Sequence, residues 1–279
     1  MLHPATVCAS VRLMKFLVRT ILGIFCVLMP LAASAAKPAT SQANLTVLSS
    51  PSLMLVMAEL TRLYSTQTGT PLTVISTANA DPAQQIEQGF EAHILLSPDP
   101  TLVERLAQRG LIDVFGTQTF ASTQLALVAP YRMKARMALA KRISFAALLF
   151  SQPDLPIYVS DPTSSSGLRA QALMTGREFS HELAKRAVVE PSQDAILAAL
   201  GEKDAFALML ASNAVVEPDV TILSLLPEST SEPVRYDAVV LASEAMDQAR
   251  GFTRFLRSAE AQAVLVRYGY QPISSDDED

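Results

Sequence analysis

A repeated unit constrains the fold of this chain more than any other feature: a short apolar strand runs through a hydroxyl-rich turn into a helix. In the first unit, the apolar residues are Leu45, Val47 and Leu48. Residues 49–52 form the turn, and apolar side chains recur every three or four positions over residues 53–64. Strands at 71–75 and 92–96 enter similar turns. Three such units predict a parallel sheet with crossover helices and ligand sites at the carboxyl ends of its strands.

Two longer apolar strands, at 124–130 and 234–242, divide the strand–helix units into two series. This order predicts an α/β protein of two lobes, each a mixed, mostly parallel sheet flanked by helices, with two hinge crossings. We expect lobe 1 at 44–127 plus 238–273 and lobe 2 at 128–237.

The N-terminal 35 residues have the pattern of a secretory signal peptide. They contain no acid but carry Arg12, Lys15 and Arg19, then an apolar run at 21–31 and the small residues Ala33-Ser-Ala35. Translation starts at Met1 or at Met14. Cleavage after residue 35 predicts a periplasmic protein with a polar leader at 36–43. The mature chain then contains no cysteine, because Cys8 and Cys26 are both removed.

The charge of the mature chain excludes one class of partner. Cleavage removes three cations, so the formal net charge falls from −5 to about −8, and the tail at 274–279 contributes four acids. Nucleic acid is therefore not an expected partner. We expect a monomer with a solvated acidic tail.

The turn at 49–52 has two interpretations. Serine at the start of a helix can cap free N–H groups, or those N–H groups and the helix dipole can attract an anion. Taken alone, the turn is more often a plain N-cap.

Several segments, taken in order, resemble the periplasmic molybdate-binding proteins of ABC importers, a family of two-lobed type II solute-binding proteins. The resemblance covers about residues 44–273. It is carried by the following matches: Leu45-Thr-Val-Leu-Ser-Ser-Pro-Ser52, Gln85-Ile-Glu-Gln-Gly89, Ile94-Leu-Leu-Ser-Pro-Asp99, Gln124-Leu-Ala-Leu-Val-Ala-Pro130, Ser160-Asp-Pro162, the run from Phe255 to Ala263, and Arg267-Tyr-Gly-Tyr270. The family implies capture of molybdate or tungstate for a membrane permease.

The resemblance also implies a ligand set. The family's first ligand serine falls on Ser52 and the second falls at 78–80, where only Asn79 offers a side-chain donor. Backbone donors fall near Ser166 and Gly167, in a loop one residue shorter than usual, and near Ser192. The family's ligand tyrosine falls on Leu210, which donates nothing. The matched turns contain no lysine or arginine before Arg169, so neutral donors are expected to hold the anion.

The departures at Asn79 and Leu210 leave two functions open. One is a molybdate or tungstate binder; the other is a binding-protein fold with an altered or decayed site that binds another anion or acts as a sensor or partner protein. An enzyme is not expected, because His93 and His181 lack partners at metal-ligand spacing and neither a Gly-x-Ser-x-Gly turn nor a phosphate loop is present. No cofactor or metal ion is expected.

Overall fold

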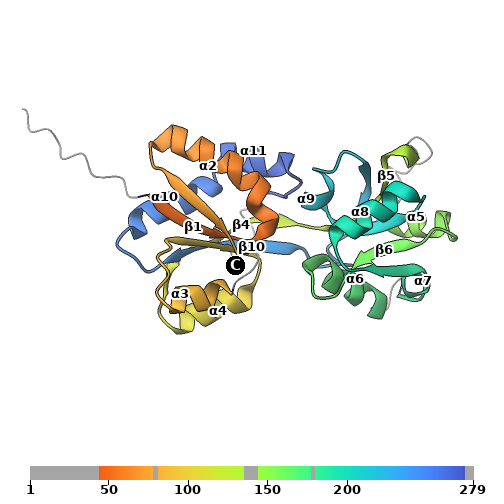
Figure 1. Ribbon diagram of the computed structural model, residues 1–279, viewed down its shortest axis with the longest axis horizontal. Coiled ribbons are helices and arrows are strands. Elements are labelled where there is room, and N and C mark those ends of the chain that lie inside the picture. Colours follow the sequence, from red (N-terminus) through yellow and green to blue (C-terminus); the bar gives the residue numbers. More distant parts are fainter. Residues whose placement is uncertain (1–43, 78–80, 135–143, 177–179, 274–279) are drawn as a thin grey trace, which may run out of the picture. The chain divides into compact units, whose positions relative to one another are not determined.

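The computed structural model describes residues 44–77, 81–134, 144–176 and 180–273. They form two five-stranded mixed sheets flanked by helices, which confirms the expected α/β two-lobed class (Figure 1). The predicted signal peptide, leader, acidic tail and Asn79 lie outside the described residues. Within those residues, no helix has both the length and the apolar character needed to cross a membrane.

The first sheet has the strand order β2-β1-β3-β10-β4. Strand β1 runs parallel to β2 and β3, whereas β10 is antiparallel to both β3 and β4. The turns after β1, β2 and β3 therefore lie at one edge of this sheet. The strands are β1 (Leu45–Ser49), β2 (Leu72–Ser76), β3 (Ile94–Ser97), β4 (Ile112–Thr123) and β10 (Val234–Leu241).

The second sheet has the order β7-β6-β8-β5-β9. Strand β6 runs parallel to β7 and β8, and β5 is antiparallel to β8 and β9. The carboxyl ends of β6, β7 and β8 therefore also share one edge. The strands are β5 (Leu125–Pro130), β6 (Ile157–Ser160), β7 (Ala187–Glu190), β8 (Phe206–Leu210) and β9 (Val220–Leu225).

Helices precede, connect and follow these strands. In chain order they are η1 (Pro51–Leu53), α2 (Met54–Thr68), α3 (Pro82–Glu87), α4 (Pro100–Gln108), η2 (Tyr131–Met133), α5 (Phe145–Ser151), α6 (Ser165–Thr175), α7 (Ser180–Arg186), α8 (Gln193–Glu202), α9 (Ala211–Ala214), α10 (Met246–Leu256) and α11 (Ala259–Arg267).

The chain passes between the sheets twice. Strand β4 of the first sheet is followed after Gln124 by β5 of the second, and β9 of the second sheet is followed by β10 of the first. The two apolar strands expected at the crossings thus each belong wholly to one sheet. The crossing segments themselves are Gln124 and residues 226–233.

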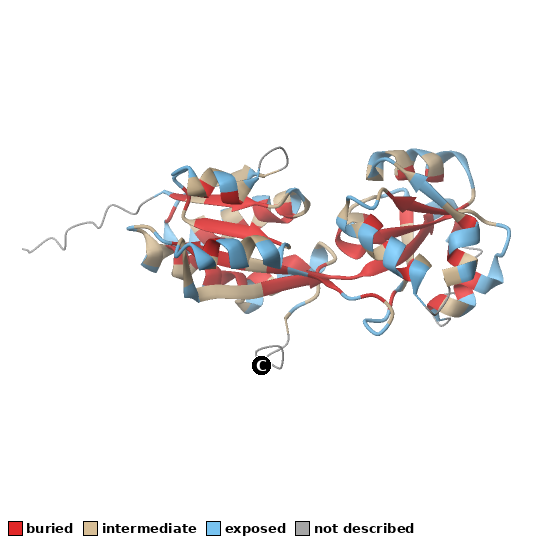
Figure 2. Cartoon of the chain, turned by 90° about the horizontal axis from the view of Figure 1, so that it is seen from below, coloured by how far each residue is buried: buried red, intermediate tan, exposed pale blue. Residues whose placement is uncertain are grey.

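Burial explains which strands the sequence revealed. Every residue of β3, β5, β6 and β8 is buried, and strands buried on both faces read as continuous apolar runs (Figure 2). Only the last four residues of β4 are buried, and β9 is partly exposed, so neither shows such a run. Neither strand is therefore predicted from the sequence.

Aromatic and aliphatic side chains hold helices α2 and α10 against the first sheet. The Tyr64 ring lies edge-on to Phe252, with 5.0 Å between ring centroids, and 5.1 Å from the ring of Phe255. These residues share a core with Leu45, Val47 and other strand residues. This packing places α2 and α10 on one core with β1.

Candidate functional site

The turn after β1 begins a helix without a side-chain cap. In this turn, residues 49–53 (the Ser52 turn), the Ser50 N–H donates to Leu96 O at 2.9 Å, which ties the turn to β3. Ser50 occupies the N-cap position of η1, yet its side chain accepts no cap hydrogen bond, and neither does that of Leu53 before α2. A plain serine N-cap is therefore not what forms. Pro51 has no N–H, and the N–H groups of Leu53 and Met54 donate to Ser50 O and Pro51 O. These bonds leave the Ser52 N–H as the backbone donor at this helix start, where an anion is favoured.

A group of hydroxyls, the Ser52 cluster, gathers on this turn. The Ser52 Oγ lies 3.0 Å from Ser50 Oγ and 3.0 Å from the hydroxyl of Tyr236 on β10. The hydroxyl of Tyr270, which follows α11, donates to Ser52 O at 2.7 Å. The two tyrosine rings meet edge to face at 5.6 Å. Ser52 thus lies among hydroxyl groups at the start of a helix, and its role in binding a ligand stays a prediction.

The tyrosines of this cluster are buried and remain protonated at neutral pH. Burial raises the pKa of the Tyr236 hydroxyl, against smaller opposing effects of the hydrogen bond with Ser52 and the charge of Arg169. Burial likewise raises the pKa of Tyr270. Sequence reasoning missed both residues. Tyr270 lies in a segment that carried the family resemblance, but nothing local to either tyrosine indicates that it reaches Ser52.

The turn after β2 lies at the same sheet edge, because β1 and β2 are parallel. The hydroxyl of Thr77 donates to Ser49 O at 3.2 Å, which joins this turn to the first one. Asp81 then caps α3 by accepting from the N–H groups of Ala83 and Gln84, with Pro82 at the first helical position. Asn79 stands between these two points and outside the described residues, so its role stays a prediction.

In the second sheet, the turn after β6 satisfies itself with local hydrogen bonds. This turn comprises residues 160–167 and is called the Ser164 turn. Its Ser164 Oγ donates to Asp161 O at 2.8 Å and accepts from the Gly167 N–H at 3.0 Å. The Ser166 hydroxyl donates to Ser160 Oγ at 3.1 Å. The predicted backbone donor at Gly167 is therefore occupied by the cap, whereas Ser165 and Ser166 stand at the first two positions of α6 with backbone N–H groups that the cap does not use.

Gly167 is required by close backbone approach. A Cβ atom at this position would stand 2.0 Å from Asp161 O and 2.4 Å from Ser160 O. Any side chain here would force the turn open. The glycine thus permits the tight passage from β6 into α6.

The other two predicted residues also lie at the carboxyl edge of the second sheet. Ser192 caps α8 by accepting from the Ala195 N–H at 3.2 Å and is exposed. Leu210 ends β8, pairs with Leu125 and is only 3% exposed within the main core. Topology brings Ser166, Gly167, Ser192 and Leu210 to one edge, whereas Ser52 lies at the corresponding edge of the first sheet.

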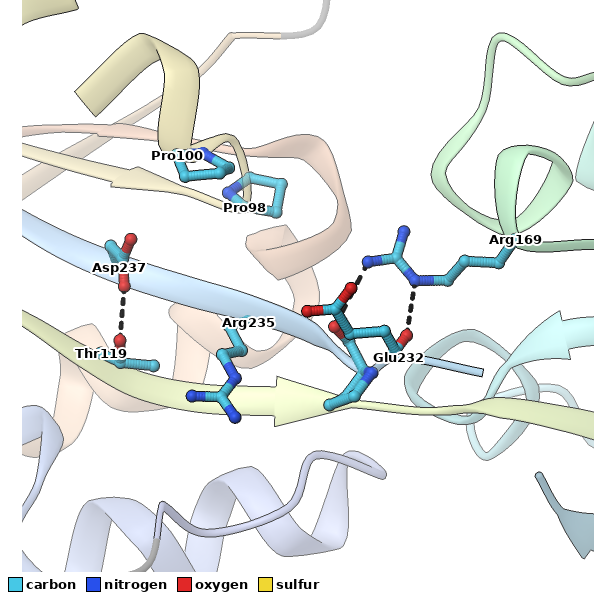
Figure 3. A pocket seen from close by; sticks show the side chains of 8 residues that line it. Pro98, Pro100, Thr119, Arg169, Glu232, Arg235 and Asp237 are labelled. Atoms are coloured by element: carbon cyan, nitrogen blue, oxygen red, sulfur yellow. Dashed lines mark hydrogen bonds between the residues drawn. The ribbon is translucent and has the colours of Figure 1, made fainter. Parts of the chain in front are cut away.

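A pocket of about 270 Å³ contains the cation Arg169 (Figure 3). Arg169 lies in the first turns of α6, and its Nε donates to Glu232 O at 2.9 Å in the segment that crosses between the sheets. Thr119 donates to Asp237 Oδ1 at 2.6 Å on the opposite wall. The lining residues are Pro98, Pro100, Thr119, Arg169, Glu232, Pro233, Arg235 and Asp237.

The histidines take the places expected of structural residues. His93 Nδ1 accepts from the Thr46 N–H at 2.9 Å, as expected for a strand-end residue satisfied by backbone, and His181 lies on α7. Among the described residues, no group of three or more His, Cys, Asp or Glu side chains is arranged to hold a metal ion.

The fold and the turns define a two-lobed α/β binding protein with polar helix starts at the carboxyl edges of both sheets. The family model of bacterial extracellular solute-binding proteins matches residues 45–271, and the chain belongs to this family. Its members are solute-binding proteins rather than enzymes.

Similar sequences and similar solved structures confirm the resemblance to molybdate-binding proteins. The molybdate-binding protein ModA of Escherichia coli is 22% identical over 232 residues, which span 82% of this chain and 89% of that protein. The substrate-binding domain of a putative molybdenum ABC transporter from Clostridium difficile superposes with a TM-score of 0.74 at 21% identity, covering 83% of this chain and 99% of that one. The tungstate-binding protein TupA of Desulfovibrio alaskensis gives 0.60 at 17% identity, covering 84% and 100%.

Proposed function

We propose that this chain is an extracytoplasmic solute-binding protein that captures a tetrahedral oxyanion of the molybdate or tungstate kind and delivers it to the permease of an ABC importer. The observation that carries the proposal is the Ser52 turn: a helix start without a side-chain cap, surrounded by the hydroxyls of Ser50, Ser52 and Tyr236. Such a start combines these hydroxyls and the Ser52 N–H with the positive end of the helix dipole. Molybdate- and tungstate-binding relatives support the choice of anion.

Binding would require the anion to replace contacts that the hydroxyls now make with one another. Ser52 Oγ would turn from Tyr236 or Ser50 to an anionic oxygen, and the backbone N–H groups of Ser165, Ser166 and the start of α8 would supply donors from the second sheet. Hydrogen bonds to a charged group contribute about 1.5–3 kcal/mol each, so four of them at the middle of this range supply about 9 kcal/mol, which corresponds to micromolar affinity. The site needs no catalytic group.

A second function has one specific observation in its favour. Leu210 is buried and apolar where the family resemblance places a donating tyrosine, which favours a site retuned to another small anion or lost in a sensor or partner protein. A retuned site still requires Ser52, whereas a decayed one does not.

Titration calorimetry of the full chain with molybdate, tungstate, sulfate and phosphate tests the proposal. We expect saturable binding of molybdate or tungstate, and Ser52→Ala should weaken it by about one to two decades, the equivalent of one lost charged hydrogen bond. The matched control is Ser144→Ala, which removes the serine cap of α5 instead. Binding of sulfate or phosphate alone would favour the retuned site. Absence of binding to all four would contradict the proposal.

The proposed compartment has a separate test. Residues 1–35 have the charge and apolar pattern of a signal peptide, and the family is extracellular by description. N-terminal sequencing of the exported protein should begin at residue 36, and retention of the first 35 residues in a soluble cell extract would contradict export. A monomer at 244 residues is expected by size-exclusion chromatography with light scattering.

A further inference from the structure

Arg169 is held in place by main-chain oxygen atoms rather than by an acid. Its Nε donates to Glu232 O at 2.9 Å and its Nη2 to Pro233 O at 3.3 Å (Figure 3). Its Nη1 donates to Ser165 O at 3.2 Å. In the part of the chain that the structure describes, no carboxylate forms an ion pair with its guanidinium. The Glu232 carboxylate acts on it only through space: its charge raises the pKa of Arg169 against the larger lowering effect of burial. The side chain is therefore positioned without a hydrogen-bonded counterion.

The guanidinium keeps two donors after these contacts. An arginine has five N–H groups, one on Nε and two on each Nη. The three hydrogen bonds use one N–H on each of the three nitrogens, so one remains on each Nη. Paired N–H groups on the two Nη nitrogens match two oxygens of a single oxyanion.

The position of Arg169 connects the two sheet edges. Arg169 lies two residues after Gly167, at the edge of the second sheet. It shares its pocket with Pro98 and Pro100, from the turn that follows β3 in the first sheet. Its charge also acts on the hydroxyl of Tyr236, which bonds Ser52 Oγ at 3.0 Å. The cation thus stands within electrostatic reach of the Ser52 cluster.

We infer that Arg169 is the residue that recognises the charge of the ligand, a dianionic tetrahedral oxyanion that takes both free Nη donors. The inference rests on the proposed function. It departs from the neutral donor set that the family resemblance implies, and the guanidinium contributes what Leu210 does not. An ion pair of this kind gives preference to doubly charged anions and weakens as salt screens it.

The test separates the effect of the positive charge at residue 169 from the effect of the arginine's shape and hydrogen bonds. The full chain and its variants Arg169→Gln and Arg169→Lys are titrated with molybdate, tungstate, sulfate and phosphate at low and high sodium chloride. The matched control is Arg132→Gln, because Arg132 also donates to main-chain oxygens, those of Leu200 and Gly201 at the far end of α8. Circular dichroism confirms that each variant is folded.

We expect Arg169→Gln to weaken binding of the preferred anion about tenfold or more and to remove most of its salt dependence. Arg169→Lys keeps the charge and should keep the salt dependence with a smaller loss, and Arg132→Gln should bind like the parent. If the parent binds an anion and Arg169→Gln retains the same salt dependence, whatever its affinity, the inference is wrong while the proposed function stands. If the parent binds none of the four anions, the proposed function itself fails.

Discussion

The Ser52 turn and the Ser164 turn hold their serines by opposite means. The Ser164 turn is closed by its own residues: Ser164 bonds Asp161 O and the Gly167 N–H, and Ser166 bonds Ser160, all within six positions of the chain. The Ser52 turn depends on Tyr236 and Tyr270, which are 184 and 218 residues away. One turn is rigid before any ligand arrives, and the other is assembled by the complete fold.

This difference assigns different tasks to the two edges. A capped turn offers fewer free donors but a fixed geometry, because each bond is made by neighbours in the chain. An uncapped turn surrounded by hydroxyls can exchange internal hydrogen bonds for bonds to a ligand at little cost, since every hydroxyl both donates and accepts. We therefore expect the Ser52 turn to supply affinity and the Ser164 turn to supply position.

The largest expected effect is on the rigid turn. Gly167→Ala places a Cβ 2.0 Å from Asp161 O, a contact that only a shift of the backbone relieves. Overpacking of this kind costs about 3 kcal/mol of the free energy of unfolding. The matched control is Gly201→Ala at the end of α8, where no heavy atom lies within 4 Å of the added carbon. Urea unfolding measures the stability of both variants, provided that the free energy of unfolding falls with urea at the same slope. Equal unfolding midpoints for Gly167→Ala and Gly201→Ala would contradict a rigid turn.

The next effect concerns the donor missing from the second sheet. Leu210→Tyr and Leu210→Phe introduce the same ring at the end of β8, so their difference isolates the hydroxyl. If Leu210 stands where the anion binds, the tyrosine variant should bind molybdate or tungstate about one to two decades more tightly than the phenylalanine variant. Titration calorimetry measures the ratio. Equal affinities would mean that residue 210 does not reach the ligand and that the aligned strand requires a different register.

The same contrast explains how much of this molecule the sequence reveals. The two-sheet architecture follows from apolar runs such as β3 and β5, because full burial on both faces selects apolar residues at every position. The helix caps at Asp81 and Ser192 follow from chemistry within three residues. Strand β4 escapes detection because its first eight residues are not buried, so no apolar run or clean alternation appears.

The candidate site is only half visible for the same reason. Ser52 is a candidate because a serine next to a helix start is a local signal, whereas Ser166 is a candidate only through the family resemblance. Tyr236 contacts Ser52 only because β10 joins the first sheet, and Tyr270 only because the segment after α11 packs against that sheet. No local sequence pattern predicts either contact. Arg169 is visible as a residue, but its anchoring on Glu232 and Pro233 also depends on tertiary structure.

The smallest expected effect tests the long-range support of the Ser52 turn. Tyr270→Phe removes the hydrogen bond to Ser52 O and should lower the free energy of unfolding by about 1 kcal/mol. The pH dependence identifies the hydroxyl as the cause. Burial raises the pKa of Tyr270 above its ordinary value of 10.0, so the unfolded chain loses this proton first and stability falls as the pH rises above about 10. The fall should be shallower in Tyr270→Phe than in the parent. Tyr131→Phe, which alters an exposed ring, is the control and should follow the parent curve. If Tyr270→Phe also follows the parent curve, the Tyr270 hydroxyl does not support the turn, and the assembly of the Ser52 cluster depends on Tyr236 alone.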